Sequence, residues 1–421
     1  MKEIDLIVHN AAQLLTMEPG LSQSPQNDKE AVEVGMIPEG AVAIHDGKVV
    51  EAGDTETIFS KYKGAKTIDA SGMVVSPGLV DPHTHAIFAG SRHLEFAMRM
   101  KGDSYMEILA GGGGIHSTVS ANRHASQQEL IELAHVRMSR ALHFGVTTME
   151  IKSGYGLDAD TEKKMLRAAR ALNLEQPVRI VSTFLGAHVV PKEYADNRSR
   201  YVDLLVREII PDVAQEKLAV ACDVFLDEGA FTRDEADTIL RAAVDVGMRP
   251  KIHAGQFTDQ RGPELIAELG GLSADHLEVV SDEGVRAMAK GDVVATLLPG
   301  AAFSLRDNFP NGRRYIDAGV TVAIATDNNP GSSRTENLPL MASMGVATMG
   351  LTCAEAWRAI TVNAAKALDL QDTCGSIKPG QSADLVLLAI PDFRAFLYHF
   401  GVNHARTVIA AGKVVFEGAT K

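Results

Sequence analysis

Eight short apolar runs recur through the middle of the chain, and stretches with helical periodicity separate them. Several helical stretches begin with a capping box, in which Ser or Thr stands three residues before Glu (126/129, 232/235 and 352/355). The runs span residues 79–83, 146–151, 178–184, 222–226, 251–253, 274–277, 293–298 and 321–325. Strands that alternate with helices in this way predict an α/β fold, a (β/α)8 TIM-like barrel.

The two ends of the chain follow a different pattern of short strands and turns. Residues 4–8, 41–44 and 48–51 are β-like near the start, and residues 383–388 and 407–415 are β-like near the end. The tetrapeptide GKVV occurs in both parts, at 47–50 and 412–415. We therefore expect both ends to pair in one small β-sandwich domain.

This pattern predicts the domain boundaries. Residues 1–75 and 367–421 are expected to form the composite β domain, and residues 76–366 the catalytic barrel. No GxGxxG motif follows the first run, and no GxxxxGK[ST] motif occurs, so the usual nucleotide-binding signals are missing from the sequence.

Composition narrows the classes of partner. The 421 residues carry a net charge of −13, which argues against nucleic acid and against anionic membranes as partners. No apolar run approaches the ~20 residues that span a bilayer, and the first residues show no signal-peptide core. The three cysteines are far apart and suggest neither a disulfide framework nor a zinc ribbon. We expect a cytoplasmic protein.

Candidate chemistry gathers where the apolar runs end. His83 and His85 follow the first run two residues apart, so on a strand they point the same way and could hold one divalent metal. Alone, this pair is equally compatible with one buried and one exposed histidine. Five of the 14 histidines, however, fall at such ends. The carboxyl ends of barrel strands meet on one face, so we expect the site there. The residues at these ends are His83, His85, Lys152–Tyr155, His188, Asp227-Glu228, His253, His276, the Pro299 turn and Asp327.

Longer segments carry a resemblance to a known family. The segments DPHTHAIFAGSR, GGGGIHST, EIKSGYGL, STFLGAH, KIHAGQ, SADHLE, LLPGAAFSL and ATDNNPGSS resemble the imidazolonepropionases, hydrolases of histidine degradation in the amidohydrolase superfamily. The resemblance covers nearly the whole chain and is weakest near its start. It implies a metal-dependent barrel hydrolase with a small β domain made from both chain ends, and a homodimer.

The resemblance also implies the metal ligands, which are His83, His85, His253 and Asp327. Three imidazoles and a carboxylate suit Zn²⁺ or Fe. Several superfamily members bridge two metals with a carbamylated lysine at the end of the fourth strand. The fourth run here ends in Asp227-Glu228 without a lysine, and Lys152 lies at the end of the second run. We predict one Zn²⁺ or Fe ion per subunit.

The reaction implied is hydrolysis of the cyclic amide of 4-imidazolone-5-propanoate, a small-molecule substrate, to N-formimidoyl-L-glutamate. The metal is expected to activate water, and Asp327 to take the proton and deliver it to the leaving nitrogen. His276 is a second candidate, either for proton transfer or for polarising the carbonyl.

Other residues are expected to bind the substrate. Arg92 can grip its propionate with two parallel hydrogen bonds. Tyr155 and His188 are expected at the ring and the carboxylate, and the loop after Asp327 offers Asn329, Gly331 and Ser332. Tyr105 is expected to close over the ligand from the segment around the glycine run 111–114, which reads as a lid.

Gln256 helps to distinguish an imidazolone hydrolase from related deaminases. Related deaminases place Glu three residues after the equivalent of His253 to shuttle protons, whereas Gln can only exchange hydrogen bonds. Some imidazolonepropionases carry Glu here, so we expect Gln256 to bind substrate without assigning it a further role. The alternatives are another cyclic amidase or deaminase of the superfamily and, from a different class, a catalytically inactive scaffold.

Overall fold

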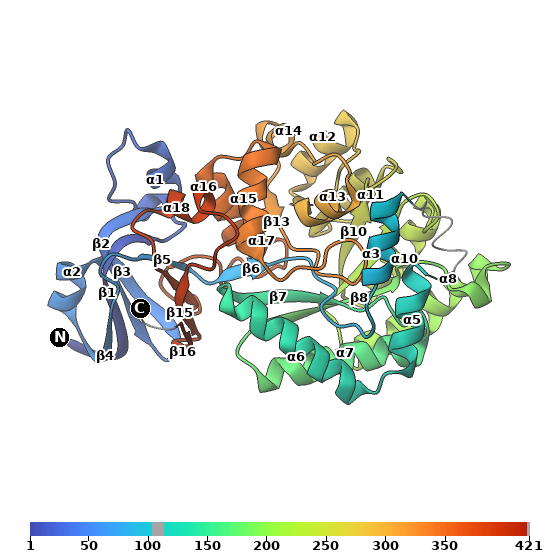
Figure 1. The fold of residues 1–421 in the computed structure, drawn as a ribbon, viewed down its shortest axis with the longest axis horizontal. Coiled ribbons are helices and arrows are strands. Elements are labelled where there is room, and N and C mark those ends of the chain that lie inside the picture. Colours follow the sequence, from blue (N-terminus) through green and yellow to red (C-terminus); the bar gives the residue numbers. More distant parts are fainter. Residues whose placement is uncertain (103–112, 419–421) are drawn as a thin grey trace.

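The computed structural model describes residues 1–102 and 113–418, and it contains the predicted barrel (Figure 1). Eight strands follow one another as parallel neighbours, each of them at one of the predicted runs. They are β6 (Leu79–Asp81), β7 (Val146–Lys152), β8 (Arg179–Ala187), β9 (Ala221–Leu226), β10 (Arg249–Ala254), β11 (Ser273–His276), β12 (Val294–Leu297) and β13 (Val322–Ile324).

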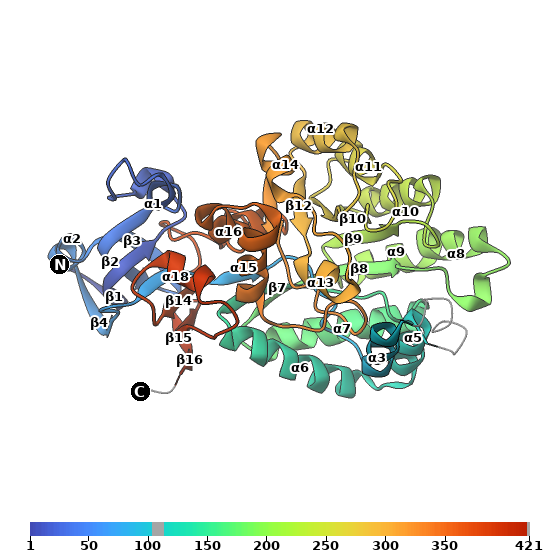
Figure 2. The ribbon, with the colours of Figure 1, turned by 45° about the horizontal axis from the view of Figure 1, so that its top comes forward.

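Helices surround this sheet, as Figure 2 shows from a second direction. All three predicted capping boxes are present, at the starts of α6, α10 and α16. The helices of the barrel region are α3 (His93–Lys101), α5 (Ile115–His124), α6 (Gln127–His143), α7 (Ala159–Glu175), α8 (Arg198–Leu204), α9 (Ile210–Gln215), α10 (Arg233–Asp245), α11 (Gly262–Glu268), α12 (Asp282–Gly291), α13 (Pro299–Leu305), α14 (Gly312–Asp317), α15 (Leu338–Met349), α16 (Cys353–Ala359) and α17 (Val362–Lys366). A π-helical turn at Leu205–Ile209 joins α8 to α9, and a 3-10 turn lies at Lys192–Tyr194.

The first and last strands of the barrel meet just beyond their carboxyl ends. Thr84 and Asn328 form a parallel bridge there. The Asp327 N–H donates to the His83 carbonyl at 3.1 Å, and the His85 N–H donates to the Asn328 carbonyl at 3.0 Å. This closure places the HxH segment beside Asp327.

Both chain ends form a separate mixed sheet, as predicted. Its order is β16-β15-β14-β5-β1-β2-β3, with β4 also paired to β1, and the antiparallel pair β5–β14 joins the two halves. The strands are β1 (Lys2–Leu15), β2 (Met36–His45), β3 (Lys48–Asp54), β4 (Tyr62–Asp69), β5 (Val74–Pro77), β14 (Leu385–Leu388), β15 (Ala405–Ala410) and β16 (Lys413–Glu417). Short helices accompany them: α1 (Lys29–Glu33), α2 (Thr55–Lys61), α18 (Phe393–Tyr398) and the 3-10 turn Pro19–Leu21. The boundaries 75/76 and 366/367 stay a prediction.

The two GKVV copies begin at equivalent hairpin turns that contact each other. Asp46 and Gly47 have φ of 49° and 72°, and Ala411 and Gly412 have φ of 46° and 75°, as tight hairpins require. A Cβ added at Gly412 would lie 3.0 Å from the Gly47 Cα, so the two turns pack backbone against backbone. The run 407–415 is therefore two strands rather than one.

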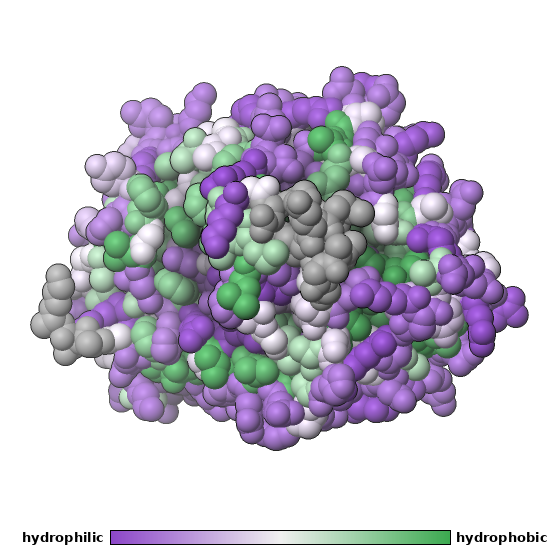
Figure 3. Space-filling model, turned by 45° about the vertical axis from the view of Figure 1, so that its right-hand side comes forward, coloured by the Kyte–Doolittle hydropathy of each residue, from purple (hydrophilic) through white to green (hydrophobic). Residues whose placement is uncertain are grey.

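The sheet has apolar contacts in two directions. Leu6, Ile44, Leu385 and Ile409 belong to one core cluster within the small domain. Residues of β5, β14 and β15 belong to the large cluster that fills the barrel region, so the two parts share a core. On the face in Figure 3, apolar side chains lie in separate patches among hydrophilic ones. In the described ranges, no helix is long and apolar enough to span a bilayer.

Candidate metal centre

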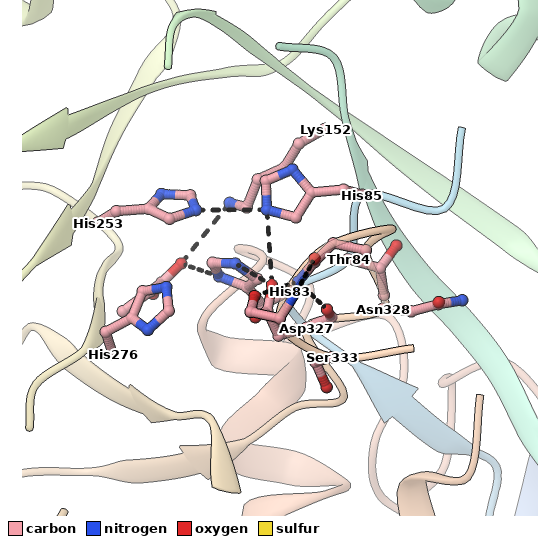
Figure 4. Close-up of polar contacts among 12 residues, drawn as sticks. His83, Thr84, His85, Lys152, His253, His276, Asp327, Asn328 and Ser333 are labelled. Carbon is pink, nitrogen blue, oxygen red and sulfur yellow. Dashed lines mark hydrogen bonds and ion pairs between the residues drawn. The ribbon is translucent and has the colours of Figure 1, made fainter. Parts of the chain in front are cut away.

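The four residues expected to bind metal converge at the carboxyl end of the barrel (Figure 4). Asp327 Oδ1 lies 3.5 Å from His83 Nε2 and 3.6 Å from His85 Nε2. His253 Nε2 lies 3.4 Å from His85 Nε2. Side chains from β10 and from the segments after β6 and β13 therefore direct ligand atoms at one small volume.

The chemistry of these atoms fits a cation. His83 Nε2 is buried and has no hydrogen-bond partner among the described residues. A buried polar atom left in that state costs about 1–3 kcal/mol, which a bound metal would offset. Burial lowers the pKa values of His83, His85 and His253 well below the usual range, so the imidazoles are neutral and can donate lone pairs.

Two aspartates fix the orientation of two of these rings. Asp275 Oδ2 lies 2.6 Å from His83 Nδ1, and Asp223 Oδ1 lies 3.0 Å from His253 Nδ1. Because a carboxylate accepts, each Nδ1 carries the proton and each Nε2 presents a lone pair to the cluster.

His276 lies at the edge of the cluster, where β11 ends. Its ring centroid is 5.5 Å from that of His253, and its backbone has a φ of 83°. Burial lowers the pKa of His276, but the carboxylates of Glu278, Asp327 and Asp275 together outweigh burial and raise that pKa above its ordinary value. The nearest of them is Glu278, whose Oε1 lies 3.7 Å from His276 Nδ1.

Tyr155 and His188 pack on His85. The His188 ring stacks on the His85 ring at a centroid distance of 5.3 Å, and the Tyr155 ring lies 5.6 Å from it. His188 Nδ1 lies 3.0 Å from the Gly154 carbonyl, which can only accept, so Nδ1 carries the proton. Burial lowers the pKa of His188 to about 4, so the ring is neutral with Nε2 as an acceptor.

The loop that presents Tyr155 is held by Glu162, a buried residue of α7. Its carboxylate accepts the backbone N–H groups of Gly154, Gly156 and Leu157, at 2.7–3.2 Å. Leu157 has a φ of 58°. The carboxylate thus satisfies three inward-facing donors of a tight loop.

Arg92 lies against the loop that follows Asp327. Its Nε donates to Glu95 at 2.8 Å, and a Cβ added at Gly331 would lie 2.3 Å from its Nη1. The Gly331 N–H donates to Asn329 Oδ1, and its carbonyl accepts from Arg99. Gly331 therefore leaves the space that the Arg92 guanidinium occupies.

Asn329 organises that loop internally. Its Oδ1 accepts the N–H groups of Gly331 and Ser332, both at 2.7 Å, and its Nδ2 donates to the Asp327 carbonyl and to Ser332 Oγ. Ser332 Oγ lies 3.4 Å from Asp327 Oδ2. The substrate contacts expected of Asn329, Gly331 and Ser332 stay predictions.

Gln256 lies at the start of the loop after β10, and Asp227 anchors this loop. Asp227 Oδ2 accepts the N–H groups of Gln256 and Phe257, and Oδ1 accepts that of Thr258. The residue at the end of the fourth strand thus binds backbone. Tyr105 lies outside the described residues, as does most of the segment around the glycine run.

Lys152 is fully buried, and Figure 4 shows it beside the histidines. Burial alone would lower its pKa, but Asp223, Glu150 and Asp275 outweigh burial and raise that pKa above its usual value. An ammonium has no lone pair, so this lysine can be neither a metal ligand nor a carbamylation site in that state.

Comparison with known proteins identifies the family. Residues 74–415 match the Amidohydrolase family. The chain is 47% identical over 414 residues to the imidazolonepropionase of Geobacillus sp. (strain WCH70) and 46% identical over 412 residues to that of Brevibacillus brevis, with 97% of each chain covered in both cases. The chain belongs to the imidazolonepropionase family. It is a hydrolase, as the sequence predicted.

Solved structures outside the imidazolonepropionases share the fold. A zinc-bound adenosine deaminase from Xanthomonas campestris has a TM-score of 0.73 at 18% identity and covers 98% of this chain and 93% of its own. The 5-methylcytosine deaminase of Klebsiella pneumoniae has a TM-score of 0.74 at 16% identity, with 99% of both chains covered. At this identity the likeness concerns architecture alone.

Several residues around the site were missed by the sequence analysis: Glu150, Glu162, Asp223, Asp275 and Glu278. A signal for some of them existed. Charged residues stand at alternate positions in otherwise apolar strands, as in MEIK of β7 and KIH of β10. Alternation places such residues on one face, and in a closed barrel that face is the interior.

Proposed function

We propose that this chain hydrolyses the ring amide of 4-imidazolone-5-propanoate and releases N-formimidoyl-L-glutamate, a step of histidine degradation. The observation that carries the proposal is the convergence of three imidazoles and the Asp327 carboxylate in a member of this family. The same cluster argues against an inactive scaffold, because its ligand set is complete.

We infer one Zn²⁺ or Fe ion, held by His83, His85, His253 and Asp327. When bound, such an ion polarises the amide carbonyl and lowers the pKa of a water molecule to near neutrality. The ammonium of Lys152 and the backbone contacts of Asp227 argue against a second, lysine-bridged ion.

Asp327 is the proposed proton carrier. Its Oδ1 faces His83 and His85, whereas its Oδ2 faces Ser332 Oγ, so one oxygen can serve the ion and the other a proton. Burial raises the pKa of Asp327 to about 7, and a bound cation would act in the opposite direction, so the position of its two oxygens is what supports the proton-transfer role. The proton goes from the attacking water to the leaving ring nitrogen.

His276 is proposed to polarise the carbonyl oxygen or to share the proton transfer. The Glu278 carboxylate beside Nδ1 favours the charged imidazolium, which can stabilise a developing negative charge.

The substrate-binding roles follow from donors and acceptors. His188 Nε2 is an acceptor and suits a ring N–H of the imidazolone, and Tyr155 covers the ring beside it. Arg92 is proposed to bind the propionate. Gln256 is proposed to bind the substrate through its amide. The loop after Asp327 is proposed to contribute Asn329, Gly331 and Ser332, and the proposed lid is expected to contribute Tyr105.

A substrate panel tests this function against its alternatives. Purified protein loaded with zinc should hydrolyse imidazolone propionate and leave a hydantoin and cytosine unchanged. Gln256 supports the expectation for cytosine, because an amide cannot shuttle the proton that a deaminase needs. Turnover of a ring that lacks the propionate, without turnover of imidazolone propionate, would refute the assignment.

The homodimer and the cytoplasmic location are also proposals, supported by the family resemblance and by the sequence. Light scattering of the purified protein should give twice the chain mass of 45.0 kDa. Fractionation of cells that produce the protein tests the location.

A further inference from the structure

Five charged side chains are enclosed in the barrel beside the histidine cluster, and two of them contact His83 and His253. Lys152 and Glu150 come from β7, Asp223 from β9, Lys251 from β10 and Asp275 from β11. Each side chain is at most 1% exposed. Buried ions persist only where other charges and hydrogen bonds offset their desolvation, so each of these side chains depends on the position of its partners.

Lys152 connects the carboxylates of this network. Its Nζ lies 2.6 Å from Asp223 Oδ2, 2.8 Å from Glu150 Oε2 and 3.6 Å from Asp275 Oδ2. Figure 4 shows its side chain extending from β7 to the histidines.

The two aspartates that Lys152 contacts are those that orient metal-binding rings. Asp223 Oδ1 bonds both Nδ1 and the backbone N–H of His253, at 3.0 and 3.1 Å. Asp275 Oδ2 bonds His83 Nδ1 at 2.6 Å, and its Oδ1 accepts from Ser273 at 2.6 Å. The Lys152 ammonium therefore contacts both aspartates of the pairs Asp223–His253 and Asp275–His83.

We propose that Lys152 is a positioning residue of the metal centre: its ammonium joins Asp223 to Asp275 and thereby aims Nε2 of His253 and of His83 at the ion. The inference rests on the metal site of the proposed function. Outer partners of metal-binding histidines typically change metal affinity 10- to 100-fold, and Lys152 lies one contact further out but acts on two histidines together.

Lys251 provides a matched control in the same network. It is equally buried, and its Nζ contacts Glu150 Oε1 at 2.8 Å and the Pro82 carbonyl at 3.2 Å. Lys251→Met removes the same charge from the same enclosed space, while Lys152 keeps its contacts to both aspartates.

The experiment compares zinc affinity, by competition with a chromophoric chelator, in the full-length protein and in Lys152→Met and Lys251→Met. We expect Lys152→Met to bind zinc at least about tenfold more weakly and Lys251→Met to stay within about threefold of the original protein. The absorption bands of the Co²⁺-loaded protein should also shift in Lys152→Met, because altered ring orientation changes the ligand field.

The outcomes separate the two proposals. Zinc affinity and Co²⁺ bands like those of the original protein in Lys152→Met, or an equal loss in Lys251→Met, would overturn the positioning role. An unmodified protein that binds no zinc would overturn the proposed metal site itself. If Lys152→Met does not fold, Lys152→Gln, which keeps an N–H donor for Asp223, undergoes the same measurement and is expected to lie between the two.

Discussion

The backbone N–H of Asp327 donates to the carbonyl oxygen of His83 at 3.1 Å. This bond belongs to the closure of the barrel, where the chain after the last strand meets the chain after the first, 244 positions earlier by residue number. The hydrogen bond that closes the barrel therefore also places Asp327 beside the two histidines of the metal site. A change that opens the seam between β6 and β13 separates Asp327 from His83 and His85.

Asp327→Asn should abolish turnover without unfolding the protein. The amide has nearly the shape of the carboxylate but cannot take a proton, and we expect kcat to fall by at least about a hundredfold. Steady-state kinetics and a thermal melt measure the two effects. An active variant would refute the proton-transfer role.

Arg92→Lys should weaken substrate binding through loss of the two-point grip on the propionate. We expect KM to rise about tenfold or more, since a charge-assisted bond contributes about 1.5–3 kcal/mol, while zinc content stays unchanged. Arg286→Lys, an exposed arginine of α12, is the control. An unchanged KM in Arg92→Lys would count against the grip.

Gly331→Ala should also disturb the position of the Arg92 guanidinium, this time through the residue that packs against it. The new methyl group would lie 2.3 Å from Arg92 Nη1, so the guanidinium must move. A several-fold rise in KM with a smaller change in kcat is expected from kinetics on imidazolone propionate. Gly20→Ala, which meets nothing within 4 Å, should leave KM unchanged; if both variants behave alike, the packing argument is wrong.

Glu162→Gln should impair the loop that carries Tyr155. The amide nitrogen would replace Oε2, which lies 2.9 Å from the Gly154 nitrogen, so two donors would face each other at a cost of about 1–3 kcal/mol. We expect a lower melting temperature together with a raised KM. Glu175→Gln, an exposed position on α7, controls for the charge change. A raised KM in the control or none in Glu162→Gln would contradict the role of this carboxylate.

Metal removal should abolish activity reversibly and lower stability. A ligand that binds only the folded state adds about 2.7 kcal/mol at a concentration 100 times its Kd. The chelator-treated protein should therefore melt at a lower temperature, and about one equivalent of zinc should restore both properties. Full activity in a metal-free protein, verified by elemental analysis, would exclude the proposed chemistry.

The sequence by itself determined the elements and their order. Short apolar runs produced the eight barrel strands, and capping boxes began α6, α10 and α16. These signals are local, because backbone geometry and helix capping depend on neighbouring residues. The histidines at strand ends were visible for the same reason, since parallel strands of a barrel share one carboxyl face.

Only the tertiary structure decided which groups satisfy one another. Lys152 and Asp223 are 71 positions apart, and His83 and Asp275 are 192 apart, so no local pattern pairs them. The place of Gly331 likewise depends on Arg92, which comes from another loop. The partner of a buried charge is set by which strands become neighbours when the barrel closes, because desolvation makes every such group depend on whatever lies beside it.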